Sequence, residues 1–475
     1  MEGLEVTEIN LKNAISITGE IRWDSEYYKK EYLENERKLQ RHKTNKFSDL
    51  CHFIKKGIFD LPPSNYIDSG VPLIRTSEIK NPTIDFSTTV YISDKTNEDN
   101  NKTMLFPNDI VFTKIGAYIG DVAMLPNKFP KYNFSQNVTG AAIKKKGFAP
   151  FYLAFFLSTM GRNQILRSAM LSGQGKLELE DIRNYKVPEC SNKFQNEIYS
   201  VFSKREELTA TSQNLYNKAE NILLQEIGLQ DFTPSQDAVN IKSFKDSFGI
   251  SGRLDAEYYQ VKYEQIVEKI KSQKHSSLVS LVSISKSIEP GSAHYSDEKG
   301  LPFYRVSDYN KFGLSQPDKE LTNAFVTENK ELITKLKPKK DTILFSKDGS
   351  VGTAYLLRED LNGITSGAIL HLQIKNTKEI LPEYLTLALN SKLVQMQAER
   401  DAGGSIILHW RVSEIENVVV PIIPFDKQQQ IAKMVEESFR LKTESEQLLE
   451  TAKKAVEIAI EQDEQTAMKY LNTSE

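Results

Sequence analysis

Apolar residues recur at every seventh position along two long stretches of the chain, and this pattern predicts two amphipathic helices. Residues 191–228 carry the first series, at Ile198, Val201, Leu208, Leu215, Ala219 and Ile222. A seven-residue period keeps these side chains on one face of a helix, as in a coiled coil. Gly228 is suited to end the helix, because glycine readily takes the left-handed conformation that closes one.

The second stretch repeats the first in the same register. Residues 424–475 carry the second series, at Ile431, Met434, Leu441, Leu448, Ala452 and Ala455. Each of these six positions follows its counterpart in the first series by 233 residues. We interpret the two series as the seam of a helix pair, in which small side chains such as Ala219 and Ala452 permit close approach.

The stretches before each helix are duplicated as well. The segment GVPLIRTSE at residues 70–78 returns as GLPFYRVSD at residues 300–308, and DIVFTKIG at residues 109–116 returns as DTILFSKDG at residues 341–349. Each segment combines turn-forming residues with an apolar run of strand length. Offsets of 230–233 residues run through the whole chain, so we predict an internal duplication.

The repeat defines the expected domain organisation. The parts are a first α/β domain at residues 1–190, a central long helix at 191–228, a connector at 229–252, a second α/β domain at 253–423 and a C-terminal long helix at 424–475. Strand-like and helix-like segments are mixed in both domains, so the expected fold class is mixed α+β, with two pseudo-repeated domains and two long helices.

Composition and cysteine content limit the class of protein and the cellular compartment that the sequence fits. The chain has 475 residues, of which 39% are hydrophobic and 26% charged, as in an ordinary globular protein. No apolar run approaches the roughly 20 residues of a membrane span, and the opening MEGLEVTEIN lacks the features of a secretory signal. Cys51 and Cys190 are too few for a disulfide or zinc framework. We therefore expect a cytoplasmic protein with no membrane contact.

Charge is distributed unevenly along the chain. Residues 101–189 contain twelve Lys and Arg against six Asp and Glu, whereas residues 425–475 contain seven against eleven. A basic region on an acidic helical support fits a nucleic-acid-binding face, and it also fits a solvated surface with chance clustering. Residues 341–421 hold seven basic and ten acidic residues, so the second domain would need a local basic patch or partner subunits to bind DNA.

Sequence motifs of an enzyme are missing. The chain has no Asn/Asp-Pro-Pro-Tyr/Phe motif of a DNA methyltransferase, and the loop at Gly173 lacks the upstream glycine of a phosphate-binding P-loop. The six histidines show no spacing typical of metal ligands. Asp109 and Asp341 each open an apolar strand, where an aspartate more often caps a turn. We therefore expect no catalytic centre and no metal site.

The order of these features resembles the specificity (S) subunit of Type I restriction-modification systems. The resemblance covers essentially all 475 residues and follows the order domain, helix, domain, helix. The motifs that carry it are Gly70-x-Pro-x-Ile-Arg75, Lys114-Ile-Gly-x-x-x-Gly120, Lys347-Asp-Gly-x-x-Gly352, Ser135-Gln136-Asn137, and the helix starts at Pro188/Gln195 and Pro421/Gln428. No single motif is specific, but the ordered set occurs twice. Ser366 departs from it, because Gly367 follows it in place of glutamine.

The resemblance implies two α/β target recognition domains, each reading one half of a split double-stranded DNA site. The two long helices would pack as an antiparallel coiled coil and set the spacer between the half-sites. A helix over residues 194–227 would be about 50 Å long, on the order of 15 base pairs. Two modification subunits would supply S-adenosylmethionine and methyl transfer, and restriction subunits would join them for cleavage. The chain itself would be non-catalytic and bind no cofactor.

Long polar side chains on loops are the groups that read bases, whereas Lys, Ser and Thr mostly contact phosphates. The candidates in the first domain are Arg75, Thr76, Lys114, Tyr118, Gln136, Asn137, Gln174 and Lys176. The candidates in the second domain are Arg305, Ser307, Lys347, Ser350, Ser366, Ser405, His409 and Arg411. The alternatives are a self-contained DNA methyltransferase or nuclease, and a coiled-coil scaffold with no DNA role.

Overall fold

The computed structural model describes residue 8 and residues 24–116, 118–169, 175–235, 237, 239–296, 299–403 and 407–473. The chain divides into two compact units. Unit 1 consists of Met1–Leu208 and Thr443–Glu475, and unit 2 consists of Thr209–Lys442. Because the divisions fall at Leu208 and Lys442, each unit contains one part of each predicted long helix.

Unit 1 is built around a four-stranded antiparallel sheet. In spatial order its strands are β2 (Cys51–Lys56), β10 (Val138–Ile143), β7 (Ile110–Thr113) and β8 (Val122–Met124). The two central strands are buried along their whole length, as their apolar sequences predict. A second sheet has the order β6 (Val90–Ile92), β3 (Val71–Ile74) and β9 (Asn133–Phe134), with β3 parallel to β9.

Unit 2 repeats this plan. Its main sheet has the order β13 (Val282–Lys286), β22 (Ile369–Ile374), β19 (Ile343–Ser346) and β20 (Ala354–Leu356). Its second sheet has the order β14 (Tyr295–Ser296), β18 (Glu320–Leu321), β15 (Leu301–Tyr304) and β21 (Ile364–Thr365). The parallel pair β15–β21 corresponds to β3–β9 in direction and in its place in the internal repeat. The predicted duplication of a mixed fold is confirmed.

Shorter elements complete the two units. In unit 1 they are α2 (Lys30–Gln40), β1 (Thr44–Lys46), β4 (Ile79–Lys80), β5 (Thr83–Ile84), α3 (Asp94–Asp99), α4 (Ala149–Leu157), α5 (Thr159–Ala169), α6 (Leu179–Asn184) and β11 (Lys186–Pro188). In unit 2 they are α8 (Phe248–Ser251), α9 (Val261–Lys271), β12 (His275–Ser277), α10 (Leu278–Leu281), β16 (Tyr309–Asn310), β17 (Gly313–Leu314), α11 (Asn323–Glu328), α12 (Lys330–Leu336), α13 (Pro382–Asn390), α14 (Lys392–Asp401), α15 (Val412–Glu416) and β23 (Val419–Pro421). Strand β1 pairs with β11, and β12 pairs with β23.

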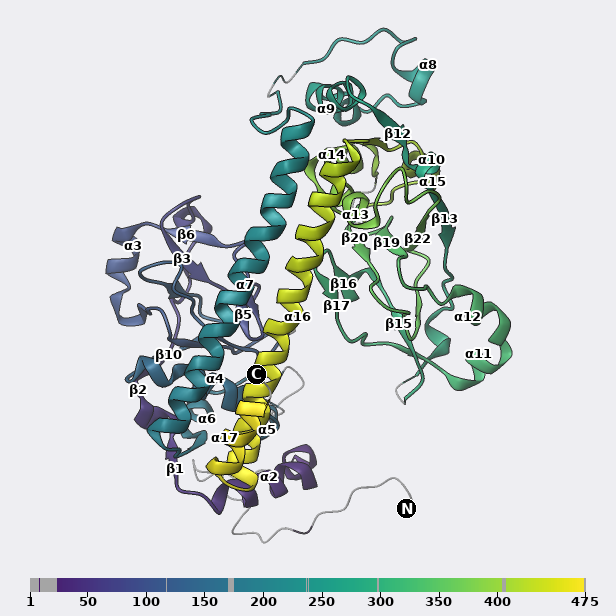
Figure 1. Ribbon diagram of the computed structural model, residues 1–475. Coiled ribbons are helices and arrows are strands. Elements are labelled where there is room, and N and C mark those ends of the chain that lie inside the picture. The colour runs from purple at the N-terminus through teal and green to yellow at the C-terminus, as the bar shows by residue number, and fades with distance from the viewer. Residues whose placement is uncertain are drawn as a thin grey trace. The chain divides into compact units, whose positions relative to one another are not determined.

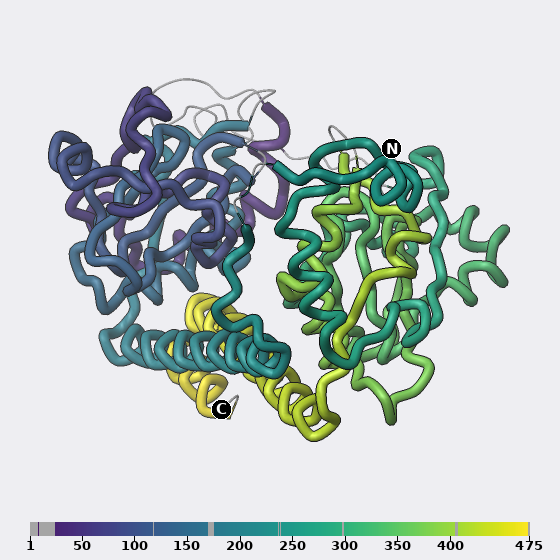
Figure 2. The backbone as a smooth tube through the Cα atoms, turned by 90° about the horizontal axis from the view of Figure 1, so that it is seen from above, coloured from purple at the N-terminus to yellow at the C-terminus, as the bar shows by residue number. Residues whose placement is uncertain are grey.

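The two long helices are α7 (Asn192–Glu226) and α16 (Phe425–Glu461), and they run beside each other (Figure 1, Figure 2). In unit 1 the first part of α7, including Ile198, shares a core with the last part of α16, including Ala455. In unit 2 the last part of α7, including Ala219, shares a core with the first part of α16, including Ile431. The helices are therefore antiparallel, as the predicted fold class requires.

The predicted seam residues differ in burial. Eight of them are buried: Ile198, Val201, Ala219, Ile431, Leu441, Leu448, Ala452 and Ala455. The other four are half-buried: Leu208, Leu215, Ile222 and Met434. On α7 the residue after each predicted position is often the more buried one, as at Phe202, Tyr216 and Leu223. In unit 2, Ser212 donates a hydrogen bond to the carbonyl of Ser438 at 2.7 Å, and Ser438 returns one at 2.8 Å.

Three helical segments of the chain are divided. Residues 149–169 form two helices, α4 and α5, which meet at the buried and extended Ser158. A Cβ on Gly161 would lie 2.1 Å from the carbonyl oxygen of Phe155, so only glycine permits this tight turn. The corresponding helix of unit 2 is divided at Ser391, and the C-terminal helix is divided into α16 and α17 (Glu464–Thr473).

The residues that precede β7 and β19 align differently from the sequence comparison. Asn108 and Asp341 both have a positive φ, of 64° and 65°, so they are the equivalent positions. Asp109, which the sequence comparison aligned with Asp341, therefore corresponds to Thr342. The fully buried carboxylate of Asp109 accepts backbone hydrogen bonds from Phe106 and Ile143 at 2.8 and 2.7 Å. This is the capping role expected for an aspartate at a strand start.

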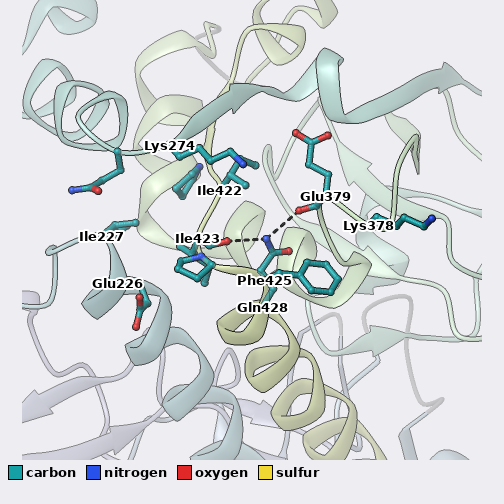
Figure 3. A pocket seen from close by; sticks show the side chains of 12 residues that line it. Glu226, Ile227, Lys274, Lys378, Glu379, Ile422, Ile423, Phe425 and Gln428 are labelled. Atoms are coloured by element: carbon teal, nitrogen blue, oxygen red, sulfur yellow. Dashed lines mark hydrogen bonds between the residues drawn. The ribbon is translucent and has the colours of Figure 1, made fainter.

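A buried glutamine holds the start of α16 in unit 2. The side chain of Gln428 donates to the carbonyls of Ile423 and Glu379, and it accepts the backbone N–H of Leu381 (Figure 3). These contacts join the strand that precedes α16 to the segment that precedes α13, beside a cavity of about 410 Å³. In unit 1, Gln195 occupies the corresponding place and donates to the carbonyl of Cys190 at 2.8 Å.

Candidate functional site

Three chain segments meet where the central strand of unit 1 ends. The backbone N–H of Lys114, directly after β7, donates to the carbonyl of Asn137 in the turn between β9 and β10. The carbonyl of Lys114 accepts from Leu177, in the segment before α6. In addition, Ser135 donates to the carbonyl of Ile74 at the end of β3. We call this meeting place the strand-end junction.

Unit 2 contains the same junction, formed by the same backbone bonds. Lys347, directly after β19, donates to the carbonyl of Ala368 at 2.9 Å and accepts from Trp410 at 2.7 Å. Ser366 donates to the carbonyl of Tyr304 at the end of β15. An antiparallel bridge joins Asp348 to His409, as one joins Ile115 to Lys176 in unit 1. The backbone arrangement of the junction is therefore part of the duplication.

Sequence reasoning missed one residue of each junction. Lys56 ends β2 and pairs with Thr139 of β10, and Lys286 ends β13 and pairs with Leu370 of β22. Their offset of 230 residues falls within the range of the internal repeat, and this regularity was the available signal. Gly57 follows Lys56 in close contact with β9, because a Cβ there would lie 2.1 Å from the carbonyl oxygen of Phe134.

Lysine side chains gather at the junction of unit 1. Lys114 is only 4% exposed, whereas Lys56 is exposed and Lys176 is half-buried. Burial is the largest cause that lowers the pKa of Lys114 from 10.5 to about 8, and the neighbouring ammonium groups of Lys56 and Lys176 contribute to the same decrease. Glu178, which pairs with Lys176 at 2.6 Å, is the carboxylate that favours the charged form. The result is a concentrated positive charge with little compensation.

Carboxylates compensate the lysines at the junction of unit 2. The ammonium of Lys347 pairs with Asp348, whose other oxygen lies 2.9 Å from Nδ1 of His409. Side-chain carbons of Lys286 and Glu289 both approach Gly367, at 3.4 and 3.3 Å from the place of its missing Cβ. Unit 2 therefore carries lysines at the same backbone positions as unit 1, each with an acidic residue nearby.

The two predicted arginines are bound within the protein. The guanidinium of Arg75 donates to the fully buried carboxylate of Glu78 at 2.8 and 3.2 Å and to the carbonyl of Thr88 at 2.7 Å. Burial opposes the charge of Glu78, but the hydrogen bonds from Arg75 outweigh it, so the pKa of Glu78 lies below its usual value. Arg305 is held more loosely, at 3.6 Å from Asp308 and 3.5 Å from Asp318. Arg75 therefore has a structural role within unit 1, whereas Arg305 is more weakly held, and for both arginines contact with DNA stays a prediction.

The remaining candidates lie on or near the junctions with different exposure. Gln136 and Thr76 are half-buried and Asn137 is exposed, while Tyr118 is 56% exposed beside the ammonium of Lys80. In unit 2 the exposed candidates are Ser307, Ser350, His409 and Arg411. Ser366 is buried, and its hydroxyl accepts the N–H of Ala368. Gln174 and Ser405 lie outside the described residues.

The part of the chain that the structure describes offers neither a metal site nor a membrane-spanning helix. No group of three His, Cys, Asp or Glu residues there could hold a metal ion. No helix in that part is long and apolar enough to cross a membrane. His371 is buried and lies 2.8 Å from the hydroxyl of Thr365, and burial lowers its pKa to about 4. It is therefore a neutral core residue at ordinary pH.

The family of the chain follows from a comparison with protein-family models. A model of the Type I restriction modification DNA specificity domain matches residues 41–221 and, a second time, residues 274–453. Each match contains one strand-end junction, so the molecule is a duplicated DNA specificity module. Because the two matches cover most of the chain, it belongs to the family of Type I restriction-modification DNA specificity subunits.

Individual relatives are similar over nearly the full length. The chain is 23% identical over 421 residues to a protein of Methanocaldococcus jannaschii assigned as the MjaX type I restriction enzyme specificity subunit, which covers 86% of this chain and 90% of that protein. Among solved structures, the S subunit from M. genitalium is 15% identical, with 90% and 95% of the two chains covered and a TM-score of 0.36. The HsdS subunit of Thermoanaerobacter tengcongensis is 13% identical, with 89% and 97% covered and a TM-score of 0.28.

Proposed function

We propose that each unit reads one half of a bipartite double-stranded DNA site through its strand-end junction. The observation that carries this proposal is the junction itself, which both units build from the same backbone bonds but fill with different side chains. Lys114 and Lys347 are retained, whereas Gln136 and Asn137 of unit 1 correspond to Gly367 and Ala368 of unit 2. A constant frame with variable polar groups suits two modules that recognise different sequences.

The chain acts as a non-catalytic subunit within a cytoplasmic restriction-modification complex. Two modification subunits bind to it, carry S-adenosylmethionine and transfer the methyl group, and restriction subunits join for cleavage. Support for this division of labour comes from the family, which is defined by DNA specificity, and from the structural roles of the buried carboxylates Asp109 and Glu78. The purified chain alone should neither methylate nor cut DNA.

The two long helices set the spacer between the half-sites. α7 and α16 contain 35 and 37 residues, and each contributes to the cores of both units. Seven residues inserted after Leu208, with seven more after Lys442 to keep the seam in register, would lengthen the pair by about 10 Å. We expect a spacer longer by about 3 base pairs with both half-sites unchanged. A change in either half-site would contradict the role of the helices as spacer.

A comparison of methylated bases with and without this chain tests the main proposal. The chain is co-expressed with its modification subunit in cells that lack other methylation systems, and the methylated bases are mapped by single-molecule sequencing. We expect one bipartite motif that disappears when the chain is omitted. Binding by the reconstituted complex without any preference among sequences at moderate salt would refute it, because phosphate contacts alone are insensitive to sequence.

A further inference from the structure

We propose that Lys56, Lys114 and Lys176 form a binding site for one phosphate of the DNA backbone, and that this site anchors unit 1 on its half-site. The inference rests on the proposed function and assigns the binding residues. The three lysines come from the end of β2, the end of β7 and the segment before α6. The fold brings them together through the β2–β10 pairing and the bridge between Ile115 and Lys176.

The burial of Lys114 is the central observation. An ammonium group that is removed from water is strongly destabilised unless an anion compensates it. Lys114 is 96% buried, the charged groups that act on it most strongly are the ammonium groups of Lys56 and Lys176, and Glu178 is already paired with Lys176 at 2.6 Å. An anion held among the three lysines would supply the missing compensation. A phosphate diester has two non-bridging oxygens that share one negative charge, and these oxygens can accept hydrogen bonds from several ammonium groups at once.

The surroundings of the cluster favour a nucleic-acid phosphate. Lys56 is exposed, so the cluster is open to solvent on one side. A Cβ on Gly116 would meet nothing within 4 Å, which indicates open space beside the loop that follows Lys114. Gln136 and Asn137 project from the turn that bonds to Lys114, and amide side chains of this kind read base edges. A ligand that presents a phosphate next to bases therefore fits both sets of groups.

Unit 2 provides a matched control within the same chain. Lys286 and Lys347 occupy the positions of Lys56 and Lys114, but Asp348 pairs with Lys347 and Glu289 lies beside Lys286. The position of Lys176 is occupied by His409. A phosphate at this junction would meet carboxylates, so the proposed site belongs to unit 1 alone.

The test compares DNA binding by the reconstituted complex with modification subunits over a range of salt concentrations. The variants are Lys114→Met, a triple variant with Lys56→Gln, Lys114→Met and Lys176→Gln, and the control Lys286→Gln. We expect the triple variant to lose roughly tenfold in affinity, both for its specific site and for unrelated DNA. The slope of log affinity against log salt concentration should become smaller in magnitude by about 0.9. The methylated motif should stay the same, and Lys286→Gln, which removes a junction lysine that lies beside Glu289, should weaken binding by a clearly smaller factor than the triple variant.

A DNA scan with single neutral methylphosphonates locates the contact. Replacement of one phosphate in the first half-site should weaken binding by the wild-type complex, while the triple variant should be insensitive at that position. An unchanged salt slope in the triple variant, or an equal effect of Lys286→Gln, would overturn the inference. Stabilisation of the wild-type chain by inorganic phosphate, combined with unaltered DNA binding by the variants, would assign the cluster to a free anion instead. Failure of the proposed function would differ, because the wild-type complex would then show no sequence preference.

Discussion

The strand-end junctions of the two units share a backbone and differ in charge. In unit 1 the lysine after the central strand is buried beside two other lysines, and one glutamate compensates the group. In unit 2 the corresponding Lys347 is bound to Asp348, which also contacts His409. The difference teaches that duplication preserved the backbone hydrogen bonds of the junction, while the charges of the side chains around it diverged.

The same contrast extends to the arginines after β3 and β15. The guanidinium of Arg75 donates two hydrogen bonds to a carboxylate that has no exposure, whereas that of Arg305 reaches its acidic partners only at 3.5–3.6 Å. Unit 1 therefore combines a tightly fixed arginine with a lysine cluster that a single glutamate compensates only in part, and unit 2 combines a loose arginine with compensated lysines. Stability and DNA affinity should respond differently to equivalent substitutions in the two units.

The largest expected difference concerns the arginines. Arg75→Gln leaves the buried carboxylate of Glu78 without its partner and should destabilise unit 1 by on the order of 3 kcal/mol, against about 1 kcal/mol for Arg305→Gln in unit 2. Urea unfolding of the full chain, with hydrogen exchange resolved by unit, measures both. The pKa of Glu78 is lower in the folded state than in the unfolded chain. The pair therefore stabilises the folded state at pH values above the ordinary carboxyl pKa, and this stabilisation is lost as the pH falls from there through the lowered pKa. Arg75→Gln should remove this acid dependence, and equal costs in the two units would contradict the comparison.

Lys114→Met should produce the next largest effect, with the opposite sign. Removal of a poorly compensated buried ammonium should stabilise the free chain near pH 7 by on the order of 2 kcal/mol while weakening DNA binding. The folded pKa is about 8 and the ordinary value 10.5, so the unfolded chain binds more protons between these pH values. The stability of the wild type should therefore rise with pH across that window relative to the variant. Thermal unfolding from pH 7 to 10.5 checks this, with Lys347→Met as the control in which no stabilisation is expected.

Gln136→Ala should reduce the discrimination between DNA bases in the half-site of unit 1 and leave that of unit 2 unchanged. Gly367 occupies the corresponding position of unit 2, so an amide side chain is available at this turn only in unit 1. Loss of a paired hydrogen bond to a base should reduce discrimination at one position by roughly tenfold. Competition binding with DNA substituted at each position of both half-sites measures the effect. Loss of discrimination in the second half-site would contradict the assignment of one unit to each half.

Asp348→Asn should give the smallest effect and make unit 2 more like unit 1. The substitution leaves Lys347 without its carboxylate partner and preserves the shape of the side chain that contacts His409. Affinity for DNA of any sequence should increase roughly threefold, with a steeper salt dependence, because one repulsive charge is removed. Binding isotherms at several salt concentrations would show this. Weaker binding would indicate that Asp348 itself accepts a hydrogen bond from a base.

The duplication and the long helices could be predicted from the sequence because both are repeated patterns with a constant offset. The centre of the seam could not, because the helices contact the unit cores as well as each other. Tyr216, for example, is buried and packs against Phe312 at a ring-centroid distance of 5.2 Å. A seven-residue period fits two adjacent series on α7 equally well, and tertiary packing decides between them.

The candidate site was predictable only where its residues lie within a repeated motif. Lys114 and Lys347 were found because each follows an apolar strand and precedes a glycine loop. Lys56 was missed because its place depends on the pairing of β2 with β10, over 80 residues later in the chain. The acidic partners of the two arginines could have been predicted from the sequence, because Glu78 lies three residues after Arg75 and Asp308 lies three residues after Arg305.

The division of the units along the chain has a consequence for how the protein folds. The core of unit 1 contains Leu448, Ala452 and Val456 from the second half of α16, whereas unit 2 is continuous from Thr209 to Lys442. During synthesis from the N-terminus, unit 2 is therefore complete before unit 1 receives the helix that closes its core, although unit 1 begins first. Until then the partners of Ile198 and Phe202 are missing, and unit 1 exposes apolar surface of the kind that chaperones bind.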